Sequence, residues 1–224
     1  MTIYIINPNS SRTVTDGIDR AMQPFRTLSP VGITALQIDE GPKGIETQAH
    51  VDGVVMPLLR RAEALETEAS AFVVACFSDP GLAALREQSR RPVLGIAESA
   101  ILTAMTLGQR FGILSILWKS VPRHMRMLGA MGVKDRCAAD LPLELGVADL
   151  TDRARTFARL REVGTTLCKT HGAEVLILGC AGMTSYRAEL SDALGSPVVE
   201  PCEAAAAMAI GRVALARAQD GRMI

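Results

Sequence analysis

Phe72-Val-Val-Ala-Cys76-Phe-Ser-Asp-Pro-Gly81 and Val175-Leu-Ile-Leu-Gly-Cys180-Ala-Gly-Met183 carry one pattern at two places in the chain. In each stretch, a run of apolar and β-branched residues that is typical of a buried parallel strand ends at a cysteine. Helix-forming residues follow, and then a second short strand that opens with Pro92-Val or Pro197-Val. Because an internal repeat marks a duplicated structural unit, the sequence predicts two similar lobes, each with a cysteine at a strand end.

The rest of the chain alternates short apolar runs with longer helical patterns, which is typical of an α/β fold with buried parallel sheets. We expect strands at residues 3–6, 33–38, 71–75, 93–96, 111–116, 175–178 and 197–199. We expect helices at residues 54–69, 82–88, 120–131, 149–171 and 203–218. The predicted fold has two pseudo-symmetric lobes, each with a mostly parallel four-stranded sheet flanked by helices, and an active site in the cleft between them. Residues 1–97 with 203–224 would form lobe 1, which carries Cys76, and residues 98–202 would form lobe 2, which carries Cys180.

The two cysteines are placed where ligands bind in α/β proteins, beyond the carboxyl ends of parallel strands. If the two lobes pack face to face, the thiols of Cys76 and Cys180 oppose one another. We expect Asp79 to cap a helix that starts at Pro80, and the positive end of that helix to lower the pKa of the Cys76 thiol. The alternative is that both cysteines only fill space in the core, since free cysteine is among the most buried residue types. Their matched placement at two strand ends favours a function.

Two opposed thiols suit the inversion of a carbon atom next to a carbonyl group. One cysteine, as thiolate, removes a proton from one face, and the other, as neutral thiol, donates a proton to the opposite face. Backbone N–H groups after each cysteine would hold the enolate oxygen, and the small residues Ala181 and Gly182 let the backbone approach a ligand closely. Since the substrate's own carbonyl acidifies the C–H bond, we expect neither a metal ion nor a pyridoxal cofactor.

Composition argues against several other classes of function. The 24 basic and 24 acidic residues leave no net charge to attract nucleic acid or an anionic membrane, so we expect a small-molecule substrate instead. Five cysteines, an odd number without paired C-x-x-C spacing, argue against a disulfide framework and a structural zinc site. The stretch from Met1 to Pro8 lacks the basic region and the long apolar run of a signal peptide, which predicts a cytoplasmic protein. No dinucleotide fingerprint or phosphate-binding loop points to a nucleotide cofactor.

Five motifs follow one another along nearly the whole chain: INPNS at 6–10, GPKGIE at 41–46, ACFSDPGL at 75–82, PVLGIAE at 92–98 and LGCAGM at 178–183. Together they resemble the hydantoin and allantoin racemases of the aspartate/glutamate racemase superfamily. The resemblance implies two pseudo-symmetric lobes with the site between them, no cofactor, a cysteine acid–base pair and a homo-oligomer. By the resemblance, Cys76 and Cys180 are catalytic, and the substrate-binding residues are Asn9, Ser10, Phe77, Ser78, Ser115, Ala181 and Gly182.

Three departures from the family pattern bear on the substrate. Ser78 stands where the hydantoin branch usually has glycine, Ser115-Ile116 replaces a usual pair of threonines, and VEPC at 199–202 replaces a more typical Asp-Gly pattern. We therefore expect a pocket adapted to something other than a standard 5-substituted hydantoin. Related decarboxylases of the arylmalonate type keep one of the two cysteines, so the presence of both favours racemisation.

The leading hypothesis is racemisation at C5 of a cyclic ureide, a hydantoin or allantoin. Two alternatives stay open: an aspartate- or glutamate-type amino-acid racemase, for which the sequence shows no clear α-carboxylate clamp, and a non-catalytic ligand-binding relative. A hydrolytic pair of Cys180 with His171 is disfavoured, because the two residues fall on different predicted elements. We interpret His50 and His124 as ordinary helix residues. Cys137, Cys168 and Cys202 are interpreted as packing residues, of which Cys202 is near enough to the last strand to approach the rim of the cleft.

Overall fold

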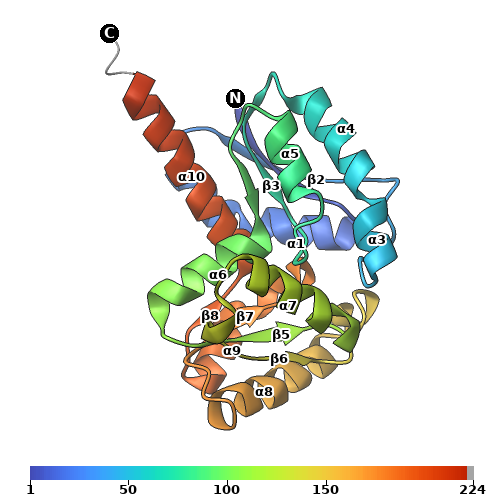
Figure 1. Ribbon diagram of the computed structural model, residues 1–224, viewed down its shortest axis with the longest axis vertical. Helices are drawn as coiled ribbons and strands as arrows, with labels where there is room; N and C mark the ends of the chain where they lie inside the picture. The colour runs from blue at the N-terminus through green and yellow to red at the C-terminus, as the bar shows by residue number, and fades with distance from the viewer. Residues whose placement is uncertain (221–224) are drawn as a thin grey trace.

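Two parallel four-stranded sheets form the frame of the protein, whose computed structural model describes residues 1–220 (Figure 1). The first sheet, in the upper half of Figure 1, has the order β2-β1-β3-β4 and contains β1 (Thr2–Asn7), β2 (Gly32–Gln37), β3 (Ala69–Val74) and β4 (Val93–Gly95). The second sheet has the order β6-β5-β7-β8 and contains β5 (Phe111–Ser115), β6 (Cys137–Pro142), β7 (Val175–Leu178) and β8 (Val198–Val199). Because the second order repeats the first, the predicted duplication and the two-lobed α/β fold are confirmed.

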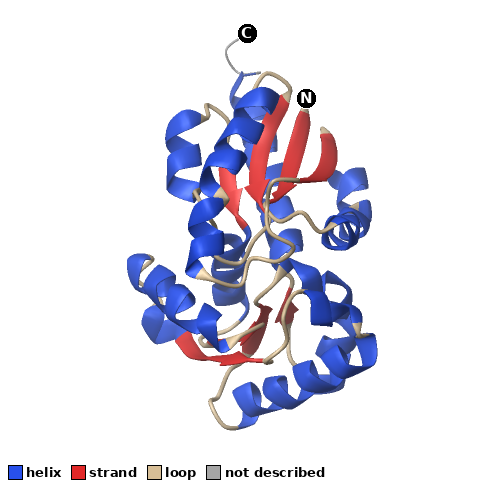
Figure 2. Ribbon diagram, turned by 90° about the vertical axis from the view of Figure 1, so that its right-hand side faces the viewer, coloured by secondary structure: helices blue, strands red, loops and turns tan. Residues whose placement is uncertain are grey.

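Helices flank both sheets (Figure 2). In chain order they are α1 (Arg12–Ala21), α2 (Gln23–Leu28), α3 (Gln48–Gly53), α4 (Val55–Leu65), α5 (Leu82–Gln88), α6 (Ile96–Leu107), α7 (Val121–Ala130), α8 (Arg153–Lys169), α9 (Arg187–Leu194) and α10 (Pro201–Asp220). Short 3₁₀ segments are η1 (Trp118–Ser120), η2 (Lys134–Arg136), η3 (Ala148–Thr151) and η4 (Ala181–Tyr186). Each predicted helical range overlaps one of these helices, whereas α1, α2, α3, α6 and α9 lie outside the predicted ranges. α6 is mostly apolar and largely buried, so it lacks the polar face that marks a surface helix.

β6 is the strand that the sequence pattern misses. It lies at the edge of the second sheet, pairs with β5, and keeps most of its side chains half-buried. It ends at Pro142, which an edge strand tolerates because one of its sides needs no hydrogen-bonded neighbour. A short, half-buried edge strand that contains Asp140 gives no continuous apolar run, and so it escapes detection.

The central strands form the core between the helical layers. All side chains of β3, β5 and β7 are buried, which explains why these strands are continuous apolar runs in the sequence. After passing through the second sheet the chain returns with α10, which packs against β3, β4 and α6. The lobe bounds at residues 97 and 202 stay a prediction, and residues 221–224 lie outside the described chain.

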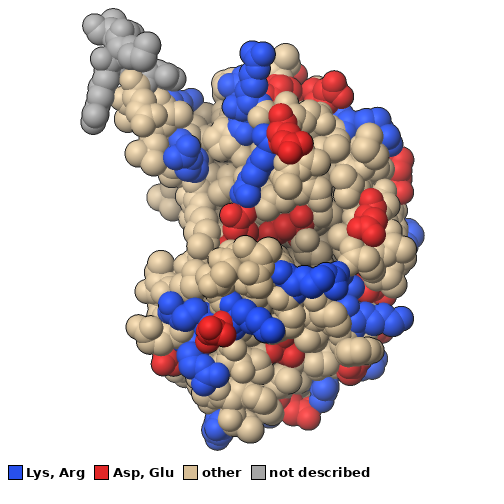
Figure 3. Space-filling view, viewed as in Figure 1, with Lys and Arg blue, Asp and Glu red and all other residues tan. Residues whose placement is uncertain are grey.

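The described part of the chain contains no helix that is both long enough and apolar enough to cross a membrane. Figure 3 shows basic and acidic side chains interspersed over one face of the molecule, as the equal numbers of the two kinds lead one to expect. The surface view therefore shows no large region of a single sign on this face.

Candidate active site

The thiols of Cys76 and Cys180 line one cavity, whose walls come from both lobes. Each cysteine lies two residues beyond the end of a strand: Cys76 follows β3, which ends at Val74, and Cys180 follows β7, which ends at Leu178. Since β3 and β7 hold equivalent positions in the two sheets, the repeat places the two thiols at equivalent strand ends. Of the predicted substrate-binding residues, those that line this thiol cavity are Asn9, Phe77, Ser78, Ala181 and Gly182.

Two predicted binding residues do not line the thiol cavity. Ser10 lies in a turn, where its backbone N–H donates to the carbonyl oxygen of Pro42 over 3.0 Å. Ser115 is fully buried at the end of β5, and its hydroxyl donates to the carboxylate of Asp140. Ser115 therefore supports the wall of the cavity from behind and does not itself form that wall.

A buried imidazole and a buried carboxylate stand at this wall. His124, on α7, lines the thiol cavity, and its Nδ1 lies 2.7 Å from Oδ2 of Asp140 on β6. The two side chains are 2% and 0% exposed. Oγ of Ser115 lies 3.1 Å from the same Nδ1, and the rings of His124 and Phe77 meet edge to face with centroids 5.1 Å apart. His124 is thus a hydrogen-bonded helix residue, but one that lines the thiol cavity, which the sequence did not indicate.

The thiol cavity is small and largely apolar. Its volume of about 30 Å³ has room for about one water molecule. The apolar side chains in its wall are those of Val14, Ile45, Ile116 and Val147. Exclusion of water from such a site lowers the local dielectric constant, which strengthens each hydrogen bond to a charge that develops there.

Asp79 caps α6, not the helix that it precedes in the chain. Its backbone has a φ of 43°, and its carboxylate accepts hydrogen bonds from the N–H groups of Ala97 (3.0 Å) and Glu98 (2.9 Å). α5 begins only at Leu82, after Gly81 in the left-handed region, and has no side-chain cap. The predicted helix start at Asp79 is therefore wrong, because a tertiary contact with α6 takes up the capping carboxylate.

Lobe 2 also has a buried carboxyl group that accepts a backbone hydrogen bond, as Asp79 does in lobe 1, but this group comes from a different position in the repeat. Glu200 stands just before α10 and accepts a hydrogen bond from the N–H of Glu203 over 2.7 Å. In the repeat, Glu200 aligns with Gly95 at the end of the Pro-Val strand, and Met183 aligns with Asp79. A Cβ atom at Gly95 would lie 2.2 Å from the Asp79 carboxyl carbon. In lobe 1 the carboxyl group therefore fills the space that a side chain at position 95 would take.

Burial controls the protonation of the site. It raises the pKa of the Cys76 thiol to about 12 and that of the Cys180 thiol to about 11. Backbone N–H groups, such as that of Gly182 at 3.3 Å from Sγ of Cys180, lower these pKa values by less than burial raises them. The predicted lowering of the Cys76 pKa is therefore wrong for the closed cavity. Burial also raises the pKa of Asp79 to about 7 and that of Glu200 to about 8.

Known proteins of similar sequence match almost the full length of the chain. The model of the family described as Asp/Glu/hydantoin racemase matches residues 3–209. The chain belongs to this racemase family. It is 36% identical over 219 residues to the hydantoin racemase of Paenarthrobacter aurescens, with 96% of this chain and 92% of that protein covered. It is 35% identical over 215 residues to the hydantoin racemase of Rhizobium meliloti, with 93% and 87% covered.

The solved structures agree with this assignment. The allantoin racemase from Klebsiella pneumoniae has the same fold, with a TM-score of 0.91 at 30% identity over 96% of this chain and 89% of that chain. The resemblance noted in the sequence is thus confirmed, and the protein is an isomerase of the racemase type.

The other cysteines of the racemase lie away from the thiol cavity. Cys202 is fully buried beside Glu200 and does not line the cavity, which agrees with its interpretation as a packing residue. Cys168, on α8, has its Sγ 3.7 Å from Oγ of Ser196. His171 does not line the cavity either, so no hydrolytic pair with the Cys180 thiol forms there. Over residues 1–220, no group of three or more His, Cys, Asp or Glu side chains is placed to hold a metal ion.

Arg123 brings a positive charge to the thiol cavity of the racemase. Its guanidinium group donates to the carbonyl oxygen of Lys119 over 2.8 Å and to Oγ of Ser120 over 3.2 Å. A longer contact of 3.5 Å reaches Oγ of Ser78 in the first lobe. These contacts engage all three nitrogen atoms of the guanidinium group and leave few of its N–H groups for a ligand.

Proposed function

We propose that this racemase inverts C5 of a cyclic ureide, a hydantoin or allantoin, and that Cys76 and Cys180 are its acid–base pair. The observation that carries the proposal is that two thiols from equivalent strand ends line one cavity. The similarity to proteins named hydantoin racemase and allantoin racemase supports the substrate class.

The proposed reaction is a proton exchange on opposite faces of one carbon atom. The thiolate of one cysteine takes the proton from C5 and forms an S–H bond, while the electron pair of the broken C–H bond is delocalised onto the C4 carbonyl oxygen as an enolate. The neutral thiol of the other cysteine then gives its proton to the opposite face of C5 and becomes the thiolate. A substrate of the opposite handedness uses the two cysteines in reversed roles.

Polar groups around the thiols support the carbonyl oxygens in this scheme. Nδ1 of His124 donates to Asp140, which leaves Nε2 as the ring nitrogen that can form a hydrogen bond with the ureide. Asn9 uses its Oδ1 to accept hydrogen bonds from Asn7 Nδ2 (3.0 Å) and from the N–H of Ser11 (2.9 Å). The side-chain N–H groups of Asn9 are then available to a ureide carbonyl oxygen.

The amino-acid racemase alternative requires a cation that binds an α-carboxylate. Arg123 is the cation at the thiol cavity, but its guanidinium group is already bonded to Lys119 and Ser120. A cyclic ureide carries no α-carboxylate and therefore needs no such cation. The mostly apolar wall, whose cation is already engaged, therefore favours the ureide.

Optical rotation tests the proposal. We expect the wild-type racemase to abolish the rotation of at least one enantiomeric substrate among 5-substituted hydantoins and allantoin. Because each thiol is needed on its own face, Cys76→Ser and Cys180→Ser should each lower kcat/KM for racemisation by about 10³-fold. Cys168→Ser, which removes a thiol outside the cavity, is the matched control and should retain full activity. Normal activity in either active-site variant contradicts the thiol pair, and a wild type that racemises no ureide contradicts the substrate class.

A further inference from the structure

A second and larger pocket adjoins the thiol cavity. It has a volume of about 710 Å³, within the usual range for ligand sites, whereas the thiol cavity has room for about one water molecule. The two spaces share four wall residues, which are Val14, Val147, Ala181 and Gly182. A molecule whose reacting carbon lies between the thiols can therefore extend a substituent into this outer pocket.

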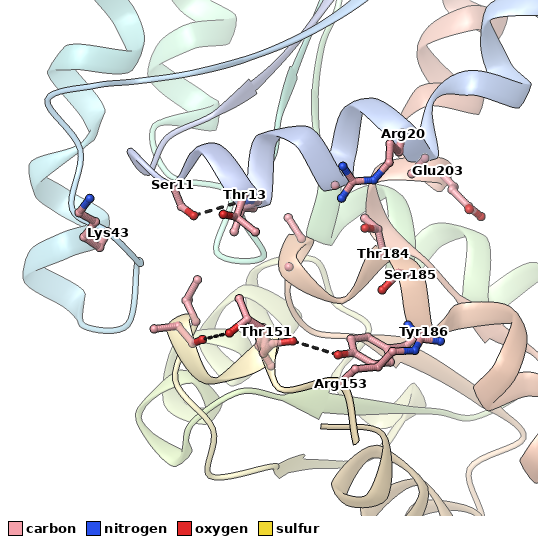
Figure 4. Close-up of a pocket in the computed structure, with 18 residues that line it drawn as sticks. Ser11, Thr13, Arg20, Lys43, Thr151, Arg153, Thr184, Ser185, Tyr186 and Glu203 are labelled. Carbon is pink, nitrogen blue, oxygen red and sulfur yellow. Dashed lines mark hydrogen bonds between the residues drawn. The ribbon is translucent and has the colours of Figure 1, made fainter. Parts of the chain in front are cut away.

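The outer pocket lies between α1 on one side and the segments η3 and η4 on the other (Figure 4). Its wall is rich in hydroxyl groups, from Ser11, Thr13, Thr151, Thr184 and Ser185. Its cations are Arg20, Lys43 and Arg153, and its carboxylate is that of Glu203. A wall of this kind suits a polar substituent that accepts hydrogen bonds.

The charges of the wall do not cancel. Glu203 lies 2.8 Å from Nε of Arg187, so its charge is balanced outside the pocket lining. Arg153 likewise pairs with Glu189 and lies over the ring of Tyr186. Within residues 1–220, Arg20 and Lys43 form no ion pair. The pocket therefore presents two cations without a matching carboxylate.

The position of Arg20 directs its charge into the pocket. Gly17 precedes it on the same face of α1, and a Cβ atom at Gly17 would lie 4.0 Å from Nη2 of Arg20 and 3.6 Å from Oγ1 of Thr184. The guanidinium group and the hydroxyl group thus both lie near a residue without a side chain, and Figure 4 shows both at the pocket. An arginine fork and a neighbouring hydroxyl form a suitable site for a carboxylate.

Lys43 reaches the pocket through a contact between the lobes. It belongs to the GPKGIE motif at 41–46, whose last residue, Glu46, accepts a hydrogen bond from the N–H of Val147 over 2.8 Å. This bond ties the motif to the segment before η3, and Lys43 lines the pocket on the side away from Arg20 (Figure 4). The two cations therefore approach the pocket from different parts of the chain.

We propose that the outer pocket binds the C5 substituent of the substrate and selects a substituent that ends in a carboxylate, which Arg20 binds and Lys43 attracts. The inference rests on the proposed function, since it takes C5 to lie between the thiols. It predicts that carboxyalkyl hydantoins are better substrates than their neutral isosteres.

Hydantoin-5-propionate and hydantoin-5-propionamide, which differ in one charge, form the test pair. We expect the wild type to have a kcat/KM about tenfold higher for the propionate, as one charge-assisted contact provides. Arg20→Gln should abolish this preference, mainly through KM, and change kcat/KM for the amide by less than about twofold. Arg12→Gln is the matched control: it removes a cation of the same helix that pairs with Asp16 over 3.0 Å and does not line the pocket.

The outcomes separate this inference from the proposed function. The inference is overturned if the wild type has equal kcat/KM values for the two hydantoins, or if Arg20→Gln lowers kcat/KM equally for both. In either case, turnover of 5-methylhydantoin still supports the ureide racemase. If no hydantoin is racemised, the proposed function fails, and calorimetric titration of the same pair decides the inference. Tighter binding of the propionate that is lost in Arg20→Gln supports it, and equal affinities overturn it.

Discussion

Nδ1 of His124 lies 2.7 Å from Oδ2 of Asp140, and this buried contact holds an imidazole that forms part of the wall around the two thiols. Ser115 donates to the second carboxylate oxygen, so both oxygens of Asp140 are occupied. Paired and fixed in this way, the imidazole cannot turn away from the cavity without leaving a buried carboxylate unpaired. The pair therefore holds Nε2 of His124 as a preorganised hydrogen-bonding group at the cavity in the proposed mechanism.

Asp140→Asn is expected to lower kcat by about 10²-fold with a smaller change in KM, because His124 loses the acceptor that fixes the orientation and the tautomer of its ring. Steady-state kinetics and ¹⁵N NMR of the imidazole check this, since the two tautomers have different ¹⁵N shifts. Asp135→Asn, at an exposed acid in η2, is the control. An Asp140→Asn variant with normal kcat would show that the contact between His124 and Asp140 does not position a group that the reaction needs.

The activity of the racemase should rise with pH between about 7 and 10, because only a thiolate can remove the C5 proton. Burial raises the pKa of the two thiols to about 12 and about 11, so the thiolate fraction is small at neutral pH and increases about tenfold per pH unit. The pH dependence of kcat/KM, which reports the free enzyme, measures this. A plateau in kcat/KM that begins below about pH 8 would mean that the thiol that removes the proton has a much lower pKa than burial in the thiol cavity produces.

Gly95→Ala should destabilise the protein by about 1–3 kcal/mol, because the added methyl group would lie 2.2 Å from the carboxyl carbon of Asp79. Gly53→Ala is the matched control, since a Cβ atom there has no neighbour within 4 Å. Urea unfolding at constant pH measures both changes. Similar stabilities of the two variants would contradict the packing of Asp79 against Gly95.

Glu200 should make the protein less stable as the pH rises. Its pKa is raised from 4.5 to about 8 in the folded protein, so the folded state holds this proton more tightly than the unfolded chain does. Its contribution to stability is then fully present below about pH 4.5 and is lost as the pH approaches about 8. Thermal unfolding at about pH 6 and about pH 9 should give a smaller difference in Tm for Glu200→Gln than for the wild type. An unchanged difference, as expected for the exposed control Glu189→Gln, would contradict the assignment.

The pattern of apolar residues along the chain predicts those strands that are buried on both faces. β3 and β7 are recognisable because both faces of each strand are buried, and the two cysteines stand out because the repeat shows the same residue at both strand ends. β6 is missed because an edge strand is buried on fewer sides and carries Asp140.

The partners within the site depend on contacts that no local pattern shows. His124 meets Asp140 across 16 residues of chain, on a strand that was itself not predicted. Asp79 caps α6 from 18 residues away, although its place before Pro80 is typical of a cap for the next helix. The raised pKa values of the two thiols could not be predicted for the same reason. The positive end of one helix is a local feature, whereas the burial that raises these pKa values comes from residues of both lobes.

Solvent-deuterium exchange at C5 by the two single-thiol variants tests the opposed thiol pair most directly. Each variant keeps one thiol, on one face of the substrate, and that thiol can remove a proton and return a deuteron to the same face. After uncatalysed exchange is subtracted, two opposed thiols predict that Cys76→Ser exchanges the C5 proton of one enantiomer and Cys180→Ser that of the other, each with retention of configuration. Exchange of both enantiomers by a single variant, or of the same enantiomer by both variants, would contradict two thiols on opposite faces of one carbon.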